Sequence, residues 1–584
     1  MARGVVTEES ARHHWKKALK RRVLSTDGVS AFSPTDLVDH TRDRLLAEYK
    51  AVQHLGTLIF ARINTLSITM RLPAEVLAHV FSMLAECDPP SAKPFPIDER
   101  GEKQHLGWIV ATHVCRRWRQ VALSSPALWT NIGAPQTAPW MEEMLARSKQ
   151  VPFTFSASIA LDRTICDVIV KALGPDHISR MKGLHLSASE CDGYGLFTEG
   201  QNKSLRIYVL KNLNHPAPML ETLVFKNMTW YNEALPQNIF ANTLPRLRRF
   251  SLDQCFELSW EAPYFRNLTD LDLDFRSKFS SAKLLTLLKE SPMLENLKIS
   301  RRGPSDDQER YVGDIVSLPA LKTFFIMSNA DAICAELLSG LAIAPTARQE
   351  IRLSGVCPEE SLLIIPVPTI PINAEELSTR LSPSTLRLIC NTNPRCSATD
   401  ITLRAWFNGE DDKLVAPQFF LRWNPATGHA AALRRVLGSF DVRGLANLVV
   451  CSEKLVTDLC DVFEDAFGRM SAIKKLTLSG RGIAPLLSYL ENTHIVPPDQ
   501  GNSKVDDEDS PQKPSLLFPE LECLCISGLP FDKTSSDALV QAVKKRDAWT
   551  ERLPKLVITK CEGSEPVARR LSKLVDNMCH KHHK

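Results

Sequence analysis

From about residue 215 onward, the chain repeats a short pattern of one apolar residue, two others, an apolar residue, one other and a third apolar residue. The first five copies begin at Leu220, Leu247, Leu268, Leu294 and Leu321, which are 27, 21, 26 and 27 residues apart. Apolar residues that alternate with period two predict a strand with one buried face. Each copy is therefore expected to supply one strand and a return segment.

Four later copies extend the series, and they begin at Leu445, Ile473, Leu521 and Leu553. A proline comes shortly before many of the strands and predicts a turn there; these prolines are Pro218, Pro245, Pro292, Pro319 and Pro519. The pattern resembles leucine-rich repeats, which implies an α/β fold with a curved parallel sheet. We expect a solenoid of ten to thirteen repeats over residues 134–566.

Two segments interrupt this pattern. Residues 345–440 are rich in proline in part and contain only partial matches, at Ile351–Leu353 and Ile401–Leu403. Residues 497–514 are polar, charged and flanked by proline, and are expected to be a disordered insertion.

The N-terminal part has a helical periodicity instead. Residues 36–63 carry apolar side chains near one face without an internal proline, so a helix or short coiled coil is expected over residues 34–67. The pattern leaves open whether this helix self-associates or packs on the helices that come after it in the chain. A second helix is predicted after Pro73, and a third over residues 108–123, with a polar, proline-rich insertion near residues 86–105 between them. Such short helices with wide apolar stripes require a partner surface or a neighbouring domain to cover them.

The charged residues are unevenly distributed only near the two ends of the chain. The net charge of +4 over 584 residues indicates no polyanionic partner, and no nucleic-acid partner is expected. Basic residues gather in two ranges. Residues 1–33 are predicted to be a disordered basic tail, and residues 567–584 are predicted to be a second basic tail. The run Lys16–Arg22 is read either as part of a solvated tail or as a nuclear-import signal.

The sequence shows neither an apolar run long enough to cross a bilayer nor a secretory signal, so no membrane partner is expected. The fifteen cysteines are scattered along the chain, which favours reduced thiols and a cytoplasmic and/or nuclear location.

Residues 68–133 contain three short motifs in order: Leu72–Glu75 (LPAE), Cys115–Arg119 (CRRWR) and Ser125–Trp129 (SPALW). With these motifs the segment resembles an F-box, in particular the F-box proteins abundant in mushroom-forming fungi. The resemblance implies that the chain binds a Skp-type adaptor. The positions that match the adaptor-binding and helix-holding residues of the motif are Leu72, Pro73, Val76, Leu77, Val80, Trp118, Leu128 and Trp129. Among these, Leu72, Pro73 and Leu77 are favoured as direct contacts.

The resemblance implies a substrate-recognition adaptor of an SCF-type (cullin-RING) ubiquitin ligase, in which the repeats bind a protein target that the sequence does not identify. Two alternatives remain open: an F-box and repeat scaffold that acts without ubiquitin transfer, and an enzyme whose site lies in residues 345–440.

The sequence contains no nucleotide-binding glycine loop, nucleophile elbow or zinc-type cysteine spacing, so no enzyme activity, cofactor or metal is expected. One candidate binding feature stands out. Asp270, Asp272 and Asp274 alternate with core leucines and are expected to line the outward face of one strand. On the concave side of a solenoid they would form an acidic patch for a basic segment of the target.

Overall fold

The structure is a computed structural model of the chain, and it divides into two compact units. The N-terminal unit comprises residues 1–130 and 143–151, and the sheet unit comprises residues 131–142 and 152–584. The structure describes residues 7–90, 106–133, 137–159, 163–188, 207–226, 238–253, 265–275, 280–301, 311–329, 332–343, 346–354, 383–392, 399–407, 416–423, 429–438, 440–453, 462, 466, 468–490, 493–494, 515–549 and 552–581. The predicted insertions near 86–105 and 497–514 lie largely outside these residues.

The N-terminal unit is helical. Its elements, with helix α5 leading into the sheet unit, are α1 (Glu8–Val23), η1 (Leu24–Thr26), α2 (Thr35–Leu66), η2 (Ile68–Arg71), α3 (Ala74–Cys87), η3 (Gly107–His113), α4 (Arg116–Ser124), η4 (Pro126–Trp129) and α5 (Ala138–Arg147).

Helix α1 corrects the prediction that residues 1–33 are disordered. Thr7 caps the helix, because its side-chain oxygen accepts a hydrogen bond from the backbone N–H of Ser10 at 3.3 Å. Acidic residues occupy the first turn and basic residues the last, as the helix dipole favours. The basic run that suggested a solvated tail therefore stabilises the end of a helix.

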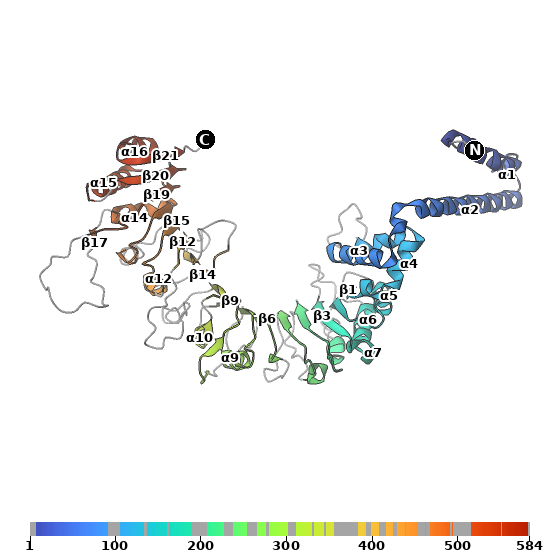
Figure 1. Cartoon of the computed structure of the whole chain (residues 1–584), viewed down its shortest axis with the longest axis horizontal. Coiled ribbons are helices and arrows are strands. Elements are labelled where there is room, and N and C mark those ends of the chain that lie inside the picture. The colour runs from blue at the N-terminus through green and yellow to red at the C-terminus, as the bar shows by residue number, and fades with distance from the viewer. Residues whose placement is uncertain are drawn as a thin grey trace. The chain divides into compact units, whose positions relative to one another are not determined.

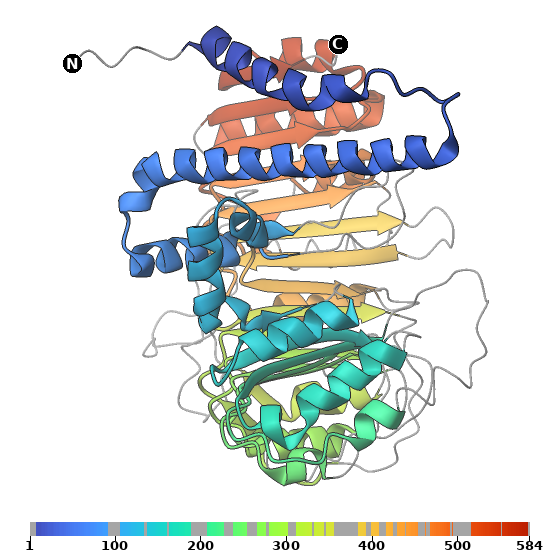
Figure 2. The ribbon, with the colours of Figure 1, turned by 90° about the vertical axis from the view of Figure 1, so that its right-hand side faces the viewer.

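The long helix expected at 34–67 is confirmed as α2, which is a single unbroken helix in Figure 2. No residue of α2 is buried, and most of its apolar side chains are exposed. The helix predicted over 108–123 is instead divided. Cys115 has an extended backbone (φ −155°, ψ 167°), which separates the short helix η3 from α4.

The sheet unit alternates strands with return segments, many of which are helical. The strands are β1 (Asn131–Ile132), β2 (Phe153–Ile159), β3 (Met181–Ala188), β4 (Thr222–Lys226), β5 (Arg249–Asp253), β6 (Asp270–Phe275), β7 (Asn296–Arg301), β8 (Val316–Leu318), β9 (Thr323–Asn329), β10 (Leu341–Ile343), β11 (Arg348–Ser354), β12 (Thr385–Thr392), β13 (Thr399–Trp406), β14 (Phe419–Trp423), β15 (Asn447–Ser452), β16 (Lys475–Ser479), β17 (Thr493–His494), β18 (Ser515–Leu516), β19 (Cys523–Ser527), β20 (Leu553–Thr559) and β21 (Val575–Lys581). The helices are α6 (Arg163–Leu173), α7 (Pro175–Ile178), η5 (Ile239–Asn242), α9 (Ser281–Lys289), α10 (Ala332–Ser339), α12 (His429–Gly438), η8 (Arg481–Ile483), α14 (Ala484–Tyr489), α15 (Lys533–Trp549) and α16 (Ser564–Leu571).

Within the described residues, one sheet of 17 strands runs through this unit. From β1 to β7 each strand pairs in parallel with the next, β9 and β11 follow in parallel, and β15, β16, β19, β20 and β21 continue in the same way. Figure 1 shows helices α6, α7, α9 and α10 on the convex side of the strands β3 to β9, whose other face is concave. The expected α/β fold is confirmed, and the sheet is mostly parallel, with β13 antiparallel to both of its neighbours.

The repeat residues form the core, as their spacing predicts. Leu223, Phe250, Leu271, Leu297 and Phe324 are aligned across neighbouring strands, and each is at most 1% exposed. The alternation predicted from the pattern is therefore confirmed.

The prolines act as predicted. In five repeats the first apolar residue donates its backbone N–H to the carbonyl three residues earlier, at 3.1–3.2 Å, and the proline is the second residue of that turn. Proline favours this turn position because its φ is fixed near the required value. The five donors are Leu220, Leu247, Leu294, Leu321 and Leu521.

Two segments that the pattern described poorly belong to the same sheet. Within 345–440, β14 pairs in parallel with β11, β13 runs antiparallel between β14 and β12, and β12 pairs in parallel with β15. The predicted basic tail at 567–584 instead contains the end of α16 and the strand β21, which pairs with β20. The buried residues Val567, Leu571 and Val575 anchor this part of the chain.

Candidate functional site

The helical module formed by η2, α3, η3, α4 and η4 has a compact aromatic core. Trp108 and Trp129 contact edge to face with ring centroids 5.0 Å apart, and Arg147 lies 4.3 Å above the Trp129 ring. The Trp129 indole N–H donates to the carbonyl of Ala122 at 2.9 Å. The ring centroids of Phe81 and Trp118 are 5.3 Å apart, so α3 and α4 contact each other through these rings.

Backbone hydrogen bonds hold the entry to α3. The guanidinium of Arg117 on α4 donates to the carbonyls of Met70 and Leu72, which lie directly before the helix. Arg119 donates to the carbonyl of Thr112 at 2.9 Å and ties α4 to η3. The LPAE and CRRWR segments of the sequence are therefore in contact through Arg117.

Helix α3 carries a second, exposed apolar stripe beside its buried one. Leu77 and Phe81 are at most 1% exposed, whereas Val76 and Val80 are 43% and 40% exposed. Further exposed apolar side chains on this module are Leu72, Met83, Leu84, Val110, Val114 and Leu123. An exposed apolar stripe such as that of Val76 and Val80 is typical of an interaction surface.

The residues matched to the adaptor-binding motif thus fall into two groups. Leu72, Pro73, Val76 and Val80 are exposed, and Trp118 is half-buried. Leu77, Leu128 and Trp129 are buried in the module, so they hold the helices together. This placement does not fit the expectation that Leu77 contacts a partner directly; its side chain points to the inner side of α3, which the stripe alone could not determine.

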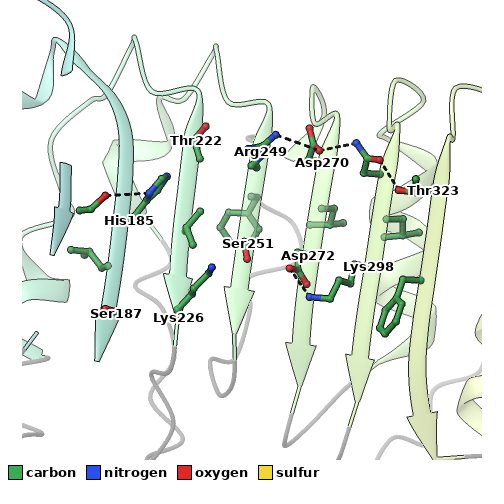
Figure 3. A pocket seen from close by; sticks show the side chains of 18 of the residues that line it. His185, Ser187, Thr222, Lys226, Arg249, Ser251, Asp270, Asp272, Lys298 and Thr323 are labelled. Atoms are coloured by element: carbon green, nitrogen blue, oxygen red, sulfur yellow. Dashed lines mark hydrogen bonds and ion pairs between the residues drawn. The ribbon is translucent and has the colours of Figure 1, made fainter. Parts of the chain in front are cut away.

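The concave face of the sheet carries a groove of about 680 Å³ over strands β2 to β9. Figure 3 shows its polar side chains in rows that cross the strands. The strand register places Thr222, Arg249, Asp270, Asn296 and Thr323 in one row. A second row holds Ser156, His185, Val224, Ser251, Asp272, Lys298 and Phe325.

The carboxylates predicted on β6 lie beside cations and amides. Asp270 accepts a hydrogen bond from the Asn296 amide at 2.8 Å and lies 3.8 Å from the Arg249 guanidinium. Asp272 lies 2.9 Å from the Lys298 ammonium. Asp274 follows on the same face of β6, with burial that alternates as expected. The groove thus carries charges of both signs.

His185 is a groove residue that the sequence analysis missed. Burial, and then the charges of Lys226 and Arg249, hold its pKa below the ordinary value of histidine. Its Nδ1 lies 3.3 Å from the hydroxyl of Ser156 on β2. The missed signal was the alternation of Leu184, His185 and Leu186, which lies upstream of the first recognised repeat.

Other features of the described residues are limited. No helix among them is both long and apolar enough to cross a membrane. Within the same part of the chain, no three side chains of His, Cys, Asp or Glu gather as metal ligands would.

Comparison with known protein families identifies the helical module. No curated protein matches the chain. A family model described as F-box-like matches residues 69–134, which contain the Arg117 contacts, the tryptophan core and the exposed stripe of α3. The helical module is therefore an F-box-like domain.

Proposed function

We propose that the chain is a substrate-recognition adaptor of an SCF-type ubiquitin ligase and itself catalyses no reaction. In this proposal the F-box-like domain binds a Skp-type adaptor, and a leucine-rich-repeat solenoid binds a protein target. The proposed mechanism is proximity: the target is held near the ligase, and the partner enzyme modifies its lysines. A cytoplasmic and/or nuclear location belongs to the same proposal.

The observation that carries the proposal is the exposed stripe of α3. Val76 and Val80 lie one helical turn apart, on an exposed face next to the buried face of Leu77 and Phe81, within the residues matched as F-box-like. Burial of each large apolar side chain at an interface contributes ~1.5–3 kcal/mol. A few such residues can therefore dominate the binding of a partner.

The test is co-purification of the full chain with a Skp-type adaptor, beside the double variant Val76→Asp/Val80→Asp. Both side chains are exposed, so the variant is expected to fold and to lose the adaptor. Met293→Asp is a matched control, because Met293 is an exposed apolar residue at a turn of the sheet unit. The proposal fails if the folded wild type does not bind the adaptor, or if the double variant binds as well as the control.

Ubiquitin transfer needs a separate measurement. Accumulation of bound proteins after proteasome inhibition, seen with the wild type and not with the double variant, supports the ligase role. If the adaptor binds but no bound protein accumulates, the alternative of a scaffold without ubiquitin transfer is favoured.

We propose the concave groove as the place where the target binds. The two rows of polar side chains that cross strands β2 to β9 support this proposal, and Figure 3 shows them facing the groove. That Asp270, Asp272 and Asp274 bind a basic segment stays a prediction.

A further inference from the structure

Helix α2 carries an apolar seam along most of its length. The residues of this α2 seam follow one another at alternating steps of four and three, which is the spacing of a coiled-coil contact. They are Leu45, Tyr49, Val52, Gly56, Ile59, Ile63 and Leu66. The six apolar side chains among them are 36–72% exposed, although a helix in a folded protein owes most of its stability to the packing of such a face. The α2 seam is therefore expected to pack on a partner.

Helix α1 lies beside the α2 seam and leaves it open. Arg22, in the last turn of α1, forms an ion pair with Glu48 at 2.6 Å, and the Arg44 guanidinium donates to the carbonyl of Arg22 at 3.4 Å. Glu48 and Arg44 lie one helical turn apart on the same side of the seam. Tyr49, directly after Glu48, is still 60% exposed. The end of α1 is therefore fixed at one side of the α2 seam without covering it.

A second copy of α2 that runs antiparallel fits this seam. In an antiparallel pair the alternate seam positions of one helix pack against those of the other, and a two-fold axis repeats every contact. With the axis at His54, the layers of the pair join Tyr49 to Ile59, Val52 to Gly56, Leu45 to Ile63 and Arg42 to Leu66 of the second copy. Each layer thus contains at least one aliphatic side chain, and the layers together span about 36 Å at ~1.5 Å per residue.

The residues beside the α2 seam match in the same register. Glu48 of one copy lies opposite Arg62 of the other, and Leu46 lies opposite Phe60. Arg22 contacts Oε1 of Glu48, and a carboxylate can accept hydrogen bonds at both oxygens, so Arg62 can share this carboxylate. Leu46 and Phe60 are 48% and 67% exposed, and their contact would bury both side chains. One flank of the pair is therefore complementary in charge and the other is apolar.

A parallel pair fits less well. In register it would place Arg42 against Arg42 and Gly56 against Gly56, so like charges would oppose each other and a gap would remain in the seam. Glu48 would lie opposite Gln53 of the second copy instead of Arg62. Charge and side-chain size therefore both favour the antiparallel orientation.

We propose that α2 binds α2 of a second copy of this chain as an antiparallel helix pair over residues 42–66, which makes the protein a dimer. This inference goes beyond the proposed function and does not depend on it, since it needs neither an adaptor nor a target. If both hold, one dimer presents two F-box-like domains and two sheet units. A target with two binding segments would then be held more tightly than by a single chain.

Sedimentation equilibrium of the full chain over a range of concentrations tests the proposal. The wild type is expected to sediment with twice the mass of one chain. Val52→Asp/Ile59→Asp is expected to weaken the dimer about a hundredfold or more, because it places charges in the packed layers. Leu37→Asp/Leu58→Asp is the matched control: both leucines are 48% exposed on the same helix, but they lie outside the α2 seam and its flanks, so the dimer should persist.

A charge exchange tests the orientation. Arg62→Glu is expected to weaken the dimer about tenfold, because it places a second carboxylate opposite Glu48 at both ends of the pair. Glu48→Arg/Arg62→Glu is expected to restore most of that loss in the antiparallel pair. In a parallel pair these two positions do not face each other, so the second change would restore nothing.

The proposal is overturned if the wild type keeps the mass of one chain at every concentration, or if its dimer is unaffected by Val52→Asp/Ile59→Asp. It is also overturned if the control variant weakens the dimer as much as this variant does. Failure of Glu48→Arg to restore the dimer refutes the antiparallel register. Far-UV circular dichroism reports the helix content of each variant. The charge-exchange variants leave the α2 seam itself unchanged, so they decide the question even if the seam variant loses helix content.

Discussion

The backbone N–H of Trp108 donates a 2.9 Å hydrogen bond to the carbonyl of Asp88. This bond joins the two ends of the insertion that separates the second and third predicted helices of the F-box-like domain. The end of α3 and the start of η3 therefore lie next to each other. The length of the insertion is therefore compatible with the packing of these helices against each other.

Gly107 is required at this junction. Its φ is +54°, and a Cβ atom there would lie 2.4 Å from the Asp88 carbonyl oxygen. Gly107→Ala is expected to lower the free energy of unfolding of the domain by ~1–3 kcal/mol, through a strained backbone and a steric clash. Urea unfolding followed by tryptophan fluorescence measures the change. Gly56→Ala in α2, where a Cβ would meet open space, is expected to cause no loss; equal effects of the two changes would contradict the argument.

Trp129 is expected to act through stability and not through direct contact with an adaptor. It is fully buried against Trp108 and Arg147, so Trp129→Ala should cost ~3–5 kcal/mol of unfolding free energy. Adaptor binding should fall in proportion to the unfolded fraction, as measured by circular dichroism and co-purification together. Trp15→Ala, at a half-exposed tryptophan, should leave both unchanged. Loss of binding by a fully folded Trp129 variant would show a direct role.

Stability of the sheet unit is expected to fall as the pH falls below about 6.5, the ordinary pKa of histidine. Burial is the first cause that lowers the pKa of both His177 and His185 in the folded chain. The unfolded chain then binds more protons than the folded chain, so acid favours unfolding. Melting temperatures between pH 7.5 and 5.5 should show a smaller decrease for His177→Gln/His185→Gln than for the wild type. If the melting temperatures of the variant and the wild type decrease equally with pH, the two histidines are not the cause of the pH dependence.

Two thiols are expected to react slowly with alkylating reagents. Burial raises the pKa of Cys390 to about 12 and is the first cause that raises the pKa of Cys525 to about 11. Because the thiolate is the reactive form, iodoacetamide at pH 8 should modify Cys525 about a hundredfold more slowly than a typical free thiol. Peptide mass spectrometry follows each site, with the exposed Cys87 as the internal comparison. In urea the rates should converge.

The sequence predicted those parts of the fold that depend on local patterns. Period-two alternation located strands such as β6 and β7, and the prolines located turns, because each feature is determined within a few residues. The order of β12, β13 and β14 could not be predicted in this way, since it depends on pairing between distant strands.

The candidate sites were predicted only in part. The motif located the F-box-like domain, but Leu77 and Val76 are neighbours in sequence, and only packing decides that one is buried and the other exposed. Likewise, Asp270 and Asp272 were found on β6, while the cations beside them come from other strands. Residues 567–584 were judged by charge, whereas Val567, Leu571 and Val575 are buried and β21, within this range, pairs with β20 in the sheet.

The antiparallel strand β13 also sets the order in which the sheet can form. Most other parallel neighbours are closer in sequence: Asn296 and Asp270, on β7 and β6, are 26 residues apart. At β12 and β15 the contact between Thr385 and Asn447 spans 62 residues. Closing a longer loop is entropically more costly, and distant pairings slow folding. Strands can add one at a time on either side, whereas β12, β13 and β14 must assemble together before the two halves share a continuous sheet. The assembly of β12, β13 and β14 is therefore the expected slow step in folding.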